Sequence, residues 1–176
     1  MSAQPQRAAI GLGSNLAEPE NQILTAFDEL ARLPHTRLAA CSSLYRSAPV
    51  GYAEQPDFVN AVALLDTRLS ALQLLHALFE LEHRHGRERT FRNAPRILDL
   101  DLLLWDGLIC HEHGLTLPHP RMHERAFVLR PLLEVAPQCV IPGRGLAAEW
   151  LAGCADQAVE KMTFSAESAE PRRAHA

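Results

Sequence analysis

The sequence predicts an α+β domain with a mainly antiparallel sheet and helices packed on one of its faces. Two observations lead to this prediction. Apolar segments follow one another in the order strand, helix, strand, strand, helix, strand and hairpin partner. Hydrophobic residues make up 47% of the 176 residues, enough to fill one core, and no repeat or linker divides the chain. Among α+β folds, this order is that of the ferredoxin-like class.

The first half of the chain supplies most of the predicted elements. The predicted strands lie in residues 7–16, where Gly11 and Gly13 break a short apolar strand, and in residues 36–47 and 57–69. Residues 20–33 carry apolar side chains at helical spacing. Ser70 and Gln73 have the spacing of a capping box, so a second helix is expected to begin there and to end at Gly86.

The second half predicts one more long strand and two short helices. Residues 96–105 form the strand, and Asp106-Gly107 is the signal of a type I′ hairpin that leads into residues 108–110. A proline-rich loop then precedes a short helix that Pro131 is expected to end. A last helix is predicted near residues 145–153. We expect one domain over residues 1–163 and a disordered polar tail over residues 164–176.

Charge and cysteine content narrow the classes of function. A net charge of −4 and a pI near 6.1 argue against nucleic acid or an anionic membrane as the main partner. No C-x-x-C spacing suggests a zinc ribbon, and the scattered cysteines suggest no disulfide framework. The N-terminus has no apolar stretch of signal-peptide length, and no apolar run approaches the roughly 20 residues of a membrane span. We therefore expect a soluble, cytoplasmic protein.

Asp99 and Asp101 interrupt the apolar strand "RILDLDLLLW". Side chains alternate between the faces of a strand, so both carboxylates point to one face and the neighbouring leucines to the other. Two like charges about 6.5–7 Å apart along the backbone resist ionising together unless a cation lies between them. A pair of Mg²⁺ ions is the usual partner when phosphates are also present. The alternative is a strand with two solvated aspartates on a water-exposed face.

Arginines gather just before this strand, in a chain that is acidic overall. They are Arg84, Arg87, Arg89, Arg92 and Arg96. The planar guanidinium suits phosphate oxygens, and carboxylate-held metal beside arginines is typical of phosphoryl transfer. A solvated loop whose arginines pair with glutamates is the alternative. A two-metal phosphohydrolase, a nucleotidyl transferase and an RNA-binding module also stay open, although the acidic charge and the lack of an aromatic RNP pattern weigh against RNA.

Other motifs carry weaker signals. "GLGSN", residues 11–15, lacks both the third glycine of a dinucleotide fingerprint and the Gly-Lys-Ser/Thr of a P-loop, so it predicts a tight strand-to-helix turn with close packing. Most of the histidines are expected at the surface. His119 is the exception, because a rigid loop between two prolines can aim its imidazole at a phosphate.

Asn60 offers the donors and the acceptor that complement a heterocycle, and Phe58 and Phe127 offer stacking faces, unless all three are core residues.

Four segments, taken in order, resemble the 6-hydroxymethyl-7,8-dihydropterin pyrophosphokinases of the folate pathway. They are "GLGSN", "QPDFVNAV", "HGRERTFRNAPRILDLDLLLW" and "LPHPRMHERAFVLRPLLEVAP", and the resemblance covers residues 8–145. It implies a ferredoxin-like α+β fold and a monomer. It also implies transfer of the β,γ-pyrophosphoryl group of ATP to the hydroxymethyl oxygen of the pterin, with release of AMP.

The resemblance further implies a set of site residues. Two Mg²⁺ ions are expected at Asp99 and Asp101, and Arg87 and Arg96 are the expected catalytic residues. The expected ATP contacts are Glu82, Arg87, Arg89, Arg96, His119 and Arg125. The expected pterin contacts are Val50, Phe58, Asn60, Asp99 and Phe127. The loop 87–95 is expected to close over ATP and exclude water. The chain departs from many family members in this loop, since it has Asn93-Ala94 where they have Trp-Gly.

Overall fold

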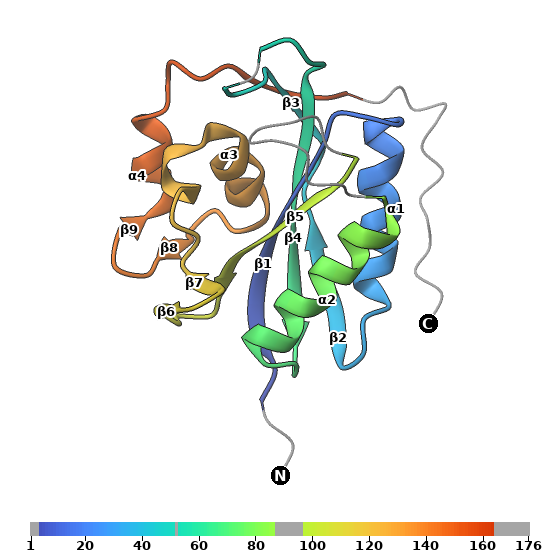
Figure 1. The fold of residues 1–176 in the computed structure, drawn as a ribbon. Helices are drawn as coiled ribbons and strands as arrows, with labels where there is room; N and C mark the ends of the chain where they lie inside the picture. Colours follow the sequence, from blue (N-terminus) through green and yellow to red (C-terminus); the bar gives the residue numbers. More distant parts are fainter. Residues whose placement is uncertain (1–3, 52, 87–96, 164–176) are drawn as a thin grey trace.

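The computed structural model describes residues 4–51, 53–86 and 97–163 of the chain. Within these residues the main sheet has six strands, and every neighbouring pair is antiparallel. Its strands are β1 (Gln6–Ser14), β2 (Thr36–Cys41), β3 (Tyr45–Ser47), β4 (Phe58–Thr67), β5 (Asp99–Trp105) and β10 (Val159–Lys161). Their order is β10-β3-β4-β1-β5, with β2 also paired to β4 (Figure 1).

Helices and two small hairpins surround this sheet. The helices are α1 (Pro19–Ala31), α2 (Ala71–Arg84), α3 (Ala126–Val135), α4 (Ala147–Ala152) and the 3-10 turn η1 (Met122–Glu124). The hairpins pair β6 (Cys110–Glu112) with β7 (Leu115–Leu117), and β8 (Val140–Ile141) with β9 (Gly145–Leu146). No helix among the described residues is both long and apolar enough to span a bilayer. The predicted tail, residues 164–176, lies outside the described residues.

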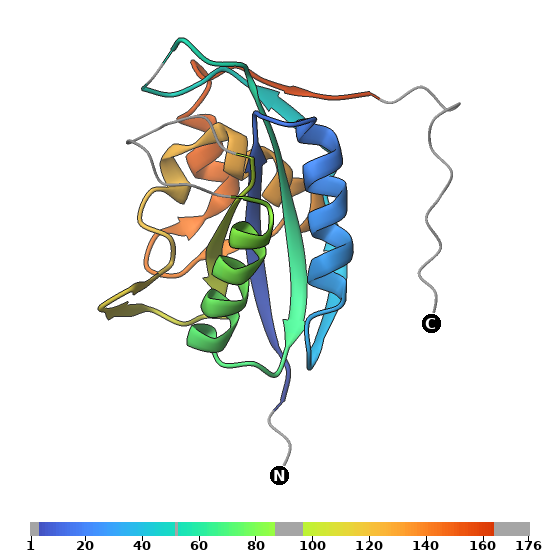
Figure 2. The ribbon, with the colours of Figure 1, turned by 45° about the vertical axis from the view of Figure 1, so that its right-hand side comes forward.

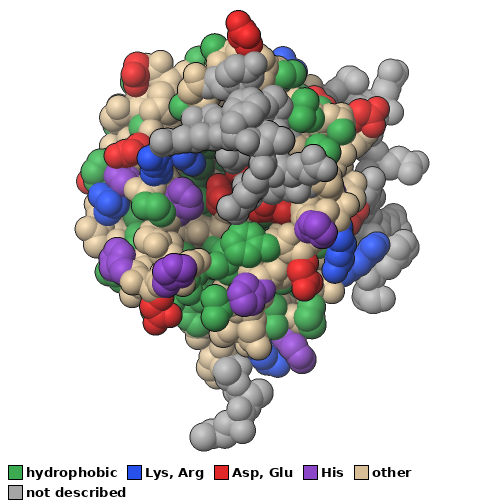
Figure 3. Space-filling view, in the orientation of Figure 1, with side chains coloured by type: hydrophobic (Ala, Val, Ile, Leu, Met, Phe, Trp, Pro, Cys, Tyr) green, Lys and Arg blue, Asp and Glu red, His purple; other side chains and the backbone are tan. Residues whose placement is uncertain are grey.

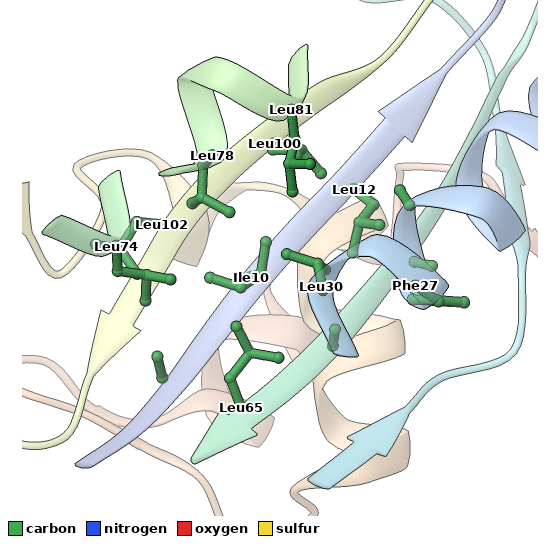
Figure 4. Packing of buried hydrophobic residues seen from close by; sticks show 14 of the residues in the cluster. Ile10, Leu12, Phe27, Leu30, Leu65, Leu74, Leu78, Leu81, Leu100 and Leu102 are labelled. Atoms are coloured by element: carbon green, nitrogen blue, oxygen red, sulfur yellow. The ribbon is translucent and has the colours of Figure 1, made fainter. Parts of the chain in front are cut away.

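Helices cover both faces of the sheet, so the predicted placement on one face was wrong. The views of Figures 1 and 2 place α1 and α2 on one side and α3 and α4 on the other. One core joins Ile10 and Leu65 of the sheet to α1 and α2 (Figure 4), and a second joins Val62 and Leu103 to α3 and α4. The reason lies in β4, where seven consecutive residues from Val59 to Leu65 are buried. Such a continuous buried run, apolar except for Asn60, is typical of a strand covered on both faces.

The predicted strand 36–47 is divided into β2 and β3, which pair with opposite ends of β4. The division falls at Ser42, whose N–H donates to the Val62 carbonyl at 2.8 Å. The Ser42 hydroxyl in turn accepts the Val62 N–H at 2.8 Å. A side chain thus completes the hydrogen bonding where the strand bends, and β3 is free to pair with β10 on its other side.

Two further predictions differ from the structure, and one is confirmed. Pro131 lies inside α3 and is buried, between Leu129 and Leu132 of the second core, and the packing of this helix outweighs the one backbone bond that proline forfeits. Asp106 adopts a positive φ of 48°, but the strand that follows pairs with β7 and not with β5. The capping box of α2 is present, with both Ser70 and Gln73 bonded as predicted, and Gly86 follows the helix at a φ of 81°.

Candidate active site

A cavity of about 570 Å³ opens where β1 ends and β4 and β5 begin, against α3 and the segment before β10. Figure 3 shows basic and histidine side chains gathered on the α3 side of this face and acidic side chains near its centre. The lining residues that the sequence predicted are Val50, Phe58, Asn60, Asp99, Asp101, Arg125 and Phe127. They come from segments far apart in the sequence, and the fold brings them to one concave surface.

Register explains how the two aspartates come to face the cavity. Asp99 lies opposite Gly13 and Asp101 opposite Gly11 in the antiparallel pair of β1 and β5. Both aspartates are half-buried, whereas Leu100 between them is buried in the first core. The predicted alternation is therefore confirmed: the carboxylates share the face of the sheet that carries the cavity.

The glycines of β1 leave room between side chains of the flanking strands. Gly13 lies opposite Asn60 of β4 on one side and opposite Asp99 of β5 on the other. Directly opposed residues point to the same face, so Asn60, Gly13 and Asp99 form one row across three strands. A Cβ on Gly13 would lie 3.5 Å from Asn60 Oδ1. The "GLGSN" glycines are thus part of β1 and line the cavity, and the predicted strand-to-helix turn at this position was wrong.

Asn60 is buried, with only 3% of its surface exposed, and its amide has a fixed orientation. The Nδ2 atom donates to Ser47 Oγ at 2.8 Å and reaches the Tyr45 carbonyl at 3.5 Å. The oxygen is therefore turned toward Gly13 and the cavity wall. A preorganised amide of this kind can recognise a planar heterocycle with mixed donors and acceptors.

Aromatic and cationic groups complete the cavity wall. Phe58 lies at the start of β4 and Phe127 in the first turn of α3, and both are half-buried. The guanidinium carbon of Arg125 lies 5.6 Å from the centroid of the Phe127 ring. This cation–π contact holds a positive charge at the cavity next to an apolar ring face. Val50 is 66% exposed, in the segment that leads toward β4.

His119 lies beside this cavity and does not line it. Burial lowers its pKa to about 4, the nearby Arg125 and Arg121 add to that effect, and the Asp99 carboxylate opposes it. Its Nδ1 accepts the N–H of Arg121 at 3.2 Å. In the neutral ring the proton is then on Nε2, which makes that atom a hydrogen-bond donor.

Glu82 has a structural position on the other face of β5. It is 2% exposed, and its Oε1 accepts the N–H of Leu100 at 3.1 Å. The bond ties α2 to the residue between the two aspartates.

The predicted site residues Arg87, Arg89 and Arg96 lie outside the described residues, as does the Asn93-Ala94 departure.

The residues present fit a hard divalent cation. Two carboxylates on one face of a rigid strand offer oxygen ligands, and Mg²⁺ commonly takes one or two carboxylates together with substrate phosphates and water. Among the described residues no group of three or more histidines, cysteines and carboxylates is placed to hold a metal by itself. Asp99 and Asp101 would therefore hold such an ion together with a phosphate-bearing ligand.

The loop before β4 is braced by the residues that follow the glycines. Asn15, which is 2% exposed, donates from Nδ2 to Gln55 Oε1 at 2.8 Å and to the Pro56 carbonyl at 3.0 Å. The hydroxyl of Ser14 donates to the Ile97 carbonyl, two residues before Asp99. The "GLGSN" segment thus connects both sides of the cavity to β1.

Two histidines that were expected at the surface are largely inside the protein. His123 is 5% exposed and packs edge-on against Trp150, with ring centroids 4.7 Å apart. The His85 ring contacts Gln22 and Glu29 of α1 at the end of α2. Neither position was evident from the sequence, because both depend on which helix packs against which.

Residues 9–137 match the family described as 7,8-dihydro-6-hydroxymethylpterin-pyrophosphokinase. The chain belongs to this family. A 2-amino-4-hydroxy-6-hydroxymethyldihydropteridine pyrophosphokinase of Pseudomonas aeruginosa is 48% identical over 157 residues, 89% of this chain and 97% of the relative. The enzyme of that name from Haemophilus influenzae is 43% identical over 155 residues, 88% of this chain and 97% of the relative.

Solved structures agree on the fold of this pyrophosphokinase-family chain. Wild-type Plasmodium falciparum HPPK-DHPS with pteroate superposes with a TM-score of 0.65 at 12% identity, over 87% of this chain and 43% of that longer chain. This likeness, together with the antiparallel sheet and its packed helices, confirms the predicted ferredoxin-like α+β class.

Some cavity residues of this pyrophosphokinase-family chain were not predicted as site residues. They include Gly11, Gly13, Arg121, Glu124 and Gln157. The glycines could have been found by placing "GLG" in a strand and alternating its faces. Arg121 follows His119 in an arginine-containing loop. Gln157 lies beyond the family match and carries no signal in the sequence.

Proposed function

We propose that this chain transfers the β,γ-pyrophosphoryl group of ATP to the hydroxymethyl oxygen of 6-hydroxymethyl-7,8-dihydropterin in folate biosynthesis. The products are AMP and the pterin diphosphate. Membership of the pyrophosphokinase family and the names of its relatives support this function. The observation that carries it is the row Asn60, Gly13 and Asp99, which puts a buried amide next to a carboxylate in one cavity.

The pterin side of the proposal uses the apolar and amide groups of the cavity. Asn60 recognises the edge of the ring, while Phe58 and Phe127 contact its faces. Val50 lies in the segment that closes one side. With the ring held there, the hydroxymethyl group is directed toward Asp99, because that carboxylate is in the same row as Asn60.

The ATP side uses the cations around the two aspartates. His119, Arg125 and Arg89 bind phosphate oxygens. Glu82, the remaining expected ATP contact, would act here only through its bond to the Leu100 N–H, which supports the strand that carries the two aspartates. Arg87 and Arg96 act on the group being transferred, where charge develops.

The reaction is a substitution at the β-phosphorus. The hydroxymethyl oxygen forms a bond to this phosphorus, the bond between phosphorus and the bridging α,β-oxygen breaks, and AMP leaves with the electron pair while the hydroxyl loses its proton. Two Mg²⁺ ions, held by Asp99 and Asp101, would supply neutralisation of the phosphate charge. The chain itself contributes orientation of both substrates, which converts an encounter in solution into a reaction within one complex.

The first test is release of AMP from ATP and Mg²⁺, with and without 6-hydroxymethyl-7,8-dihydropterin. We expect AMP release that depends on the pterin in the parent chain and that falls roughly thousandfold in Asp99→Ala, because a metal ligand is lost. Asp106→Ala, in the exposed turn after β5, is the matched control and should keep parental activity. Phosphate release without pterin, or no AMP at all, would instead favour a phosphohydrolase that uses the same aspartates.

We also propose that the chain acts as a monomer in the cytoplasm, without nucleic acid or membrane. Its net charge of −4 supports the absence of nucleic acid and of an anionic membrane as partners. Light scattering at micromolar concentration measures the molecular mass of the protein in solution. The mass of a dimer would contradict the proposed monomeric state.

A further inference from the structure

Gln157 bonds to the backbone on both sides of a proposed ATP-binding arginine. It lies between α4 and β10, beyond the residues 9–137 that match the family, and it lines the cavity. Its side-chain oxygen accepts the Ala126 N–H at 2.9 Å. Its side-chain nitrogen donates to the Glu124 carbonyl at 2.8 Å. Arg125 is the residue between these two contacts, so one amide spans the junction at which η1 ends and α3 begins.

This junction sets the direction of two cavity side chains. Arg125 is the N-cap of α3, with extended backbone at φ −118° and ψ 107°, and no side chain of its own caps the helix. The first N–H groups of a helix lack partners within the helix, and Gln157 satisfies that of Ala126. Phe127 follows at once, and its ring is in contact with the Arg125 guanidinium. A shift of this backbone would therefore displace both side chains together.

The segment that carries Gln157 is itself anchored on both sides. The Gln157 N–H donates to the Cys154 carbonyl at 3.0 Å. Arg130 of α3 donates from Nη1 to the Val159 carbonyl at 2.7 Å, and β10 continues as an edge strand beside β3. Gln157 thus lies between a local turn on one side and a bond to α3 on the other, which gives its amide a defined place although the residue is exposed.

We propose that Gln157 is a positioning residue for the reaction. It fixes the η1–α3 junction, so that Arg125 faces the phosphates of ATP and Phe127 faces the pterin. It acts through these two residues. This role rests on the function proposed above, and it extends the site to a segment that the family match does not include.

The test compares the parent chain with Gln157→Met, which keeps the length of the side chain and removes both hydrogen bonds. We expect kcat/KM for ATP in pterin-dependent AMP release to fall about tenfold, because small displacements of positioning groups cost rate. Gln138→Met, in the exposed turn after α3, is the control and should match the parent. Both variants should keep a two-state thermal transition close to that of the parent. Parental kcat/KM in Gln157→Met would overturn the proposal.

A double mutant separates positioning from a general structural effect. If Gln157 acts through Arg125, adding Gln157→Met to Arg125→Ala should cause little further loss of kcat/KM for ATP. A loss equal to the product of the two single effects would overturn the proposal, because independent sites combine in that way.

Amide hydrogen exchange tests whether Gln157 holds the η1–α3 junction, without reference to activity. The Ala126 N–H should exchange at least about tenfold faster in Gln157→Met than in the parent, since it loses its acceptor. An unchanged exchange rate of the Ala126 N–H would overturn the proposal that Gln157 holds this junction, even if the enzyme is active. If the parent releases no pterin-dependent AMP, the proposed function fails, whereas the exchange rates still decide whether Gln157 holds the junction.

Discussion

His119, a proposed contact of the ATP phosphates, has a protonation state that its surroundings set. Its Nδ1 is occupied by the Arg121 N–H at 3.2 Å, and its pKa is lowered to about 4 by burial and by Arg125 and Arg121, against the opposing charge of Asp99. At neutral pH the ring is then neutral and donates from Nε2. A neutral donor can bind a phosphate oxygen without adding a further cation next to the two arginines.

The pH dependence of stability tests this state. The unfolded imidazole has a pKa of 6.5 and the folded one a pKa of about 4, so the unfolded chain binds the proton more readily between these values. The contribution of His119 to stability is therefore full above pH 6.5 and declines as the pH falls toward 4. We expect the free energy of unfolding in urea to fall less between pH 7 and pH 4.5 in His119→Gln than in the parent. His76→Gln, exposed on α2, is the control. Equal pH slopes in all three proteins would contradict the lowered pKa.

At the scale of elements, the segment after β1 determines where the loop before β4 lies. The Asn15 amide donates to Gln55 Oε1 and to the Pro56 carbonyl, and its side chain is buried. Loss of these bonds would release the segment that carries Val50, while the core strands stay in place. The cost should therefore appear mainly in pterin binding.

Asn15→Ala tests this brace. We expect KM for the pterin to rise about tenfold, and the free energy of unfolding to fall by about 1–3 kcal/mol, the usual cost of removing buried hydrogen bonds. Steady-state AMP release and urea denaturation measure the two effects. Asn21→Ala on α1 removes an exposed amide that bonds only to Glu18 among the contacts described, and it should change neither quantity. A loss of stability with parental KM would show that Asn15 supports the fold but not the loop.

Sequence motifs predicted the elements that depend on contacts between near neighbours in the chain. They missed the elements that depend on packing against residues far away in the sequence. The capping box of Ser70 and Gln73 located the start of α2, because both bonds lie within one turn. Pro131 was expected to end a helix, and only the packing of α3 against the sheet explains why it does not. The small strand β10 has no signal of its own, since it exists by pairing with β3 more than a hundred residues earlier. Gln157 was missed for a similar reason, since the two backbone groups that it bonds lie 31 and 33 residues earlier.

At the scale of the whole molecule, the two faces of the sheet have different roles. The face under α1 and α2 holds the larger apolar core, and Glu82 supports β5 from that side. The face under α3 and α4 holds the second core and the cavity. The sequence predicted Asp99 and Asp101 from alternation along one strand, and the motif resemblance supplied Asn60 and Phe127. The long run of β4 did indicate that both faces of the sheet are covered, but which helix lies on which face depends on how the chain crosses the sheet.

This division predicts different effects for one substitution made on opposite faces. Leu74 on α2 and Leu129 on α3 are both 0% exposed, and truncation of either to alanine should lower the free energy of unfolding by about 2–5 kcal/mol. Leu129→Ala should also lower kcat/KM for ATP and pterin roughly tenfold, because α3 carries Phe127 and adjoins Arg125 at the cavity. Leu74→Ala should stay within about threefold of the parent at a temperature where both variants are folded, since it leaves that wall in place. Urea denaturation measures the stabilities, and AMP release measures the kinetics. Equal kinetic losses on the two faces would mean that the sheet transmits disorder from one core to the other and that the site depends on the whole domain.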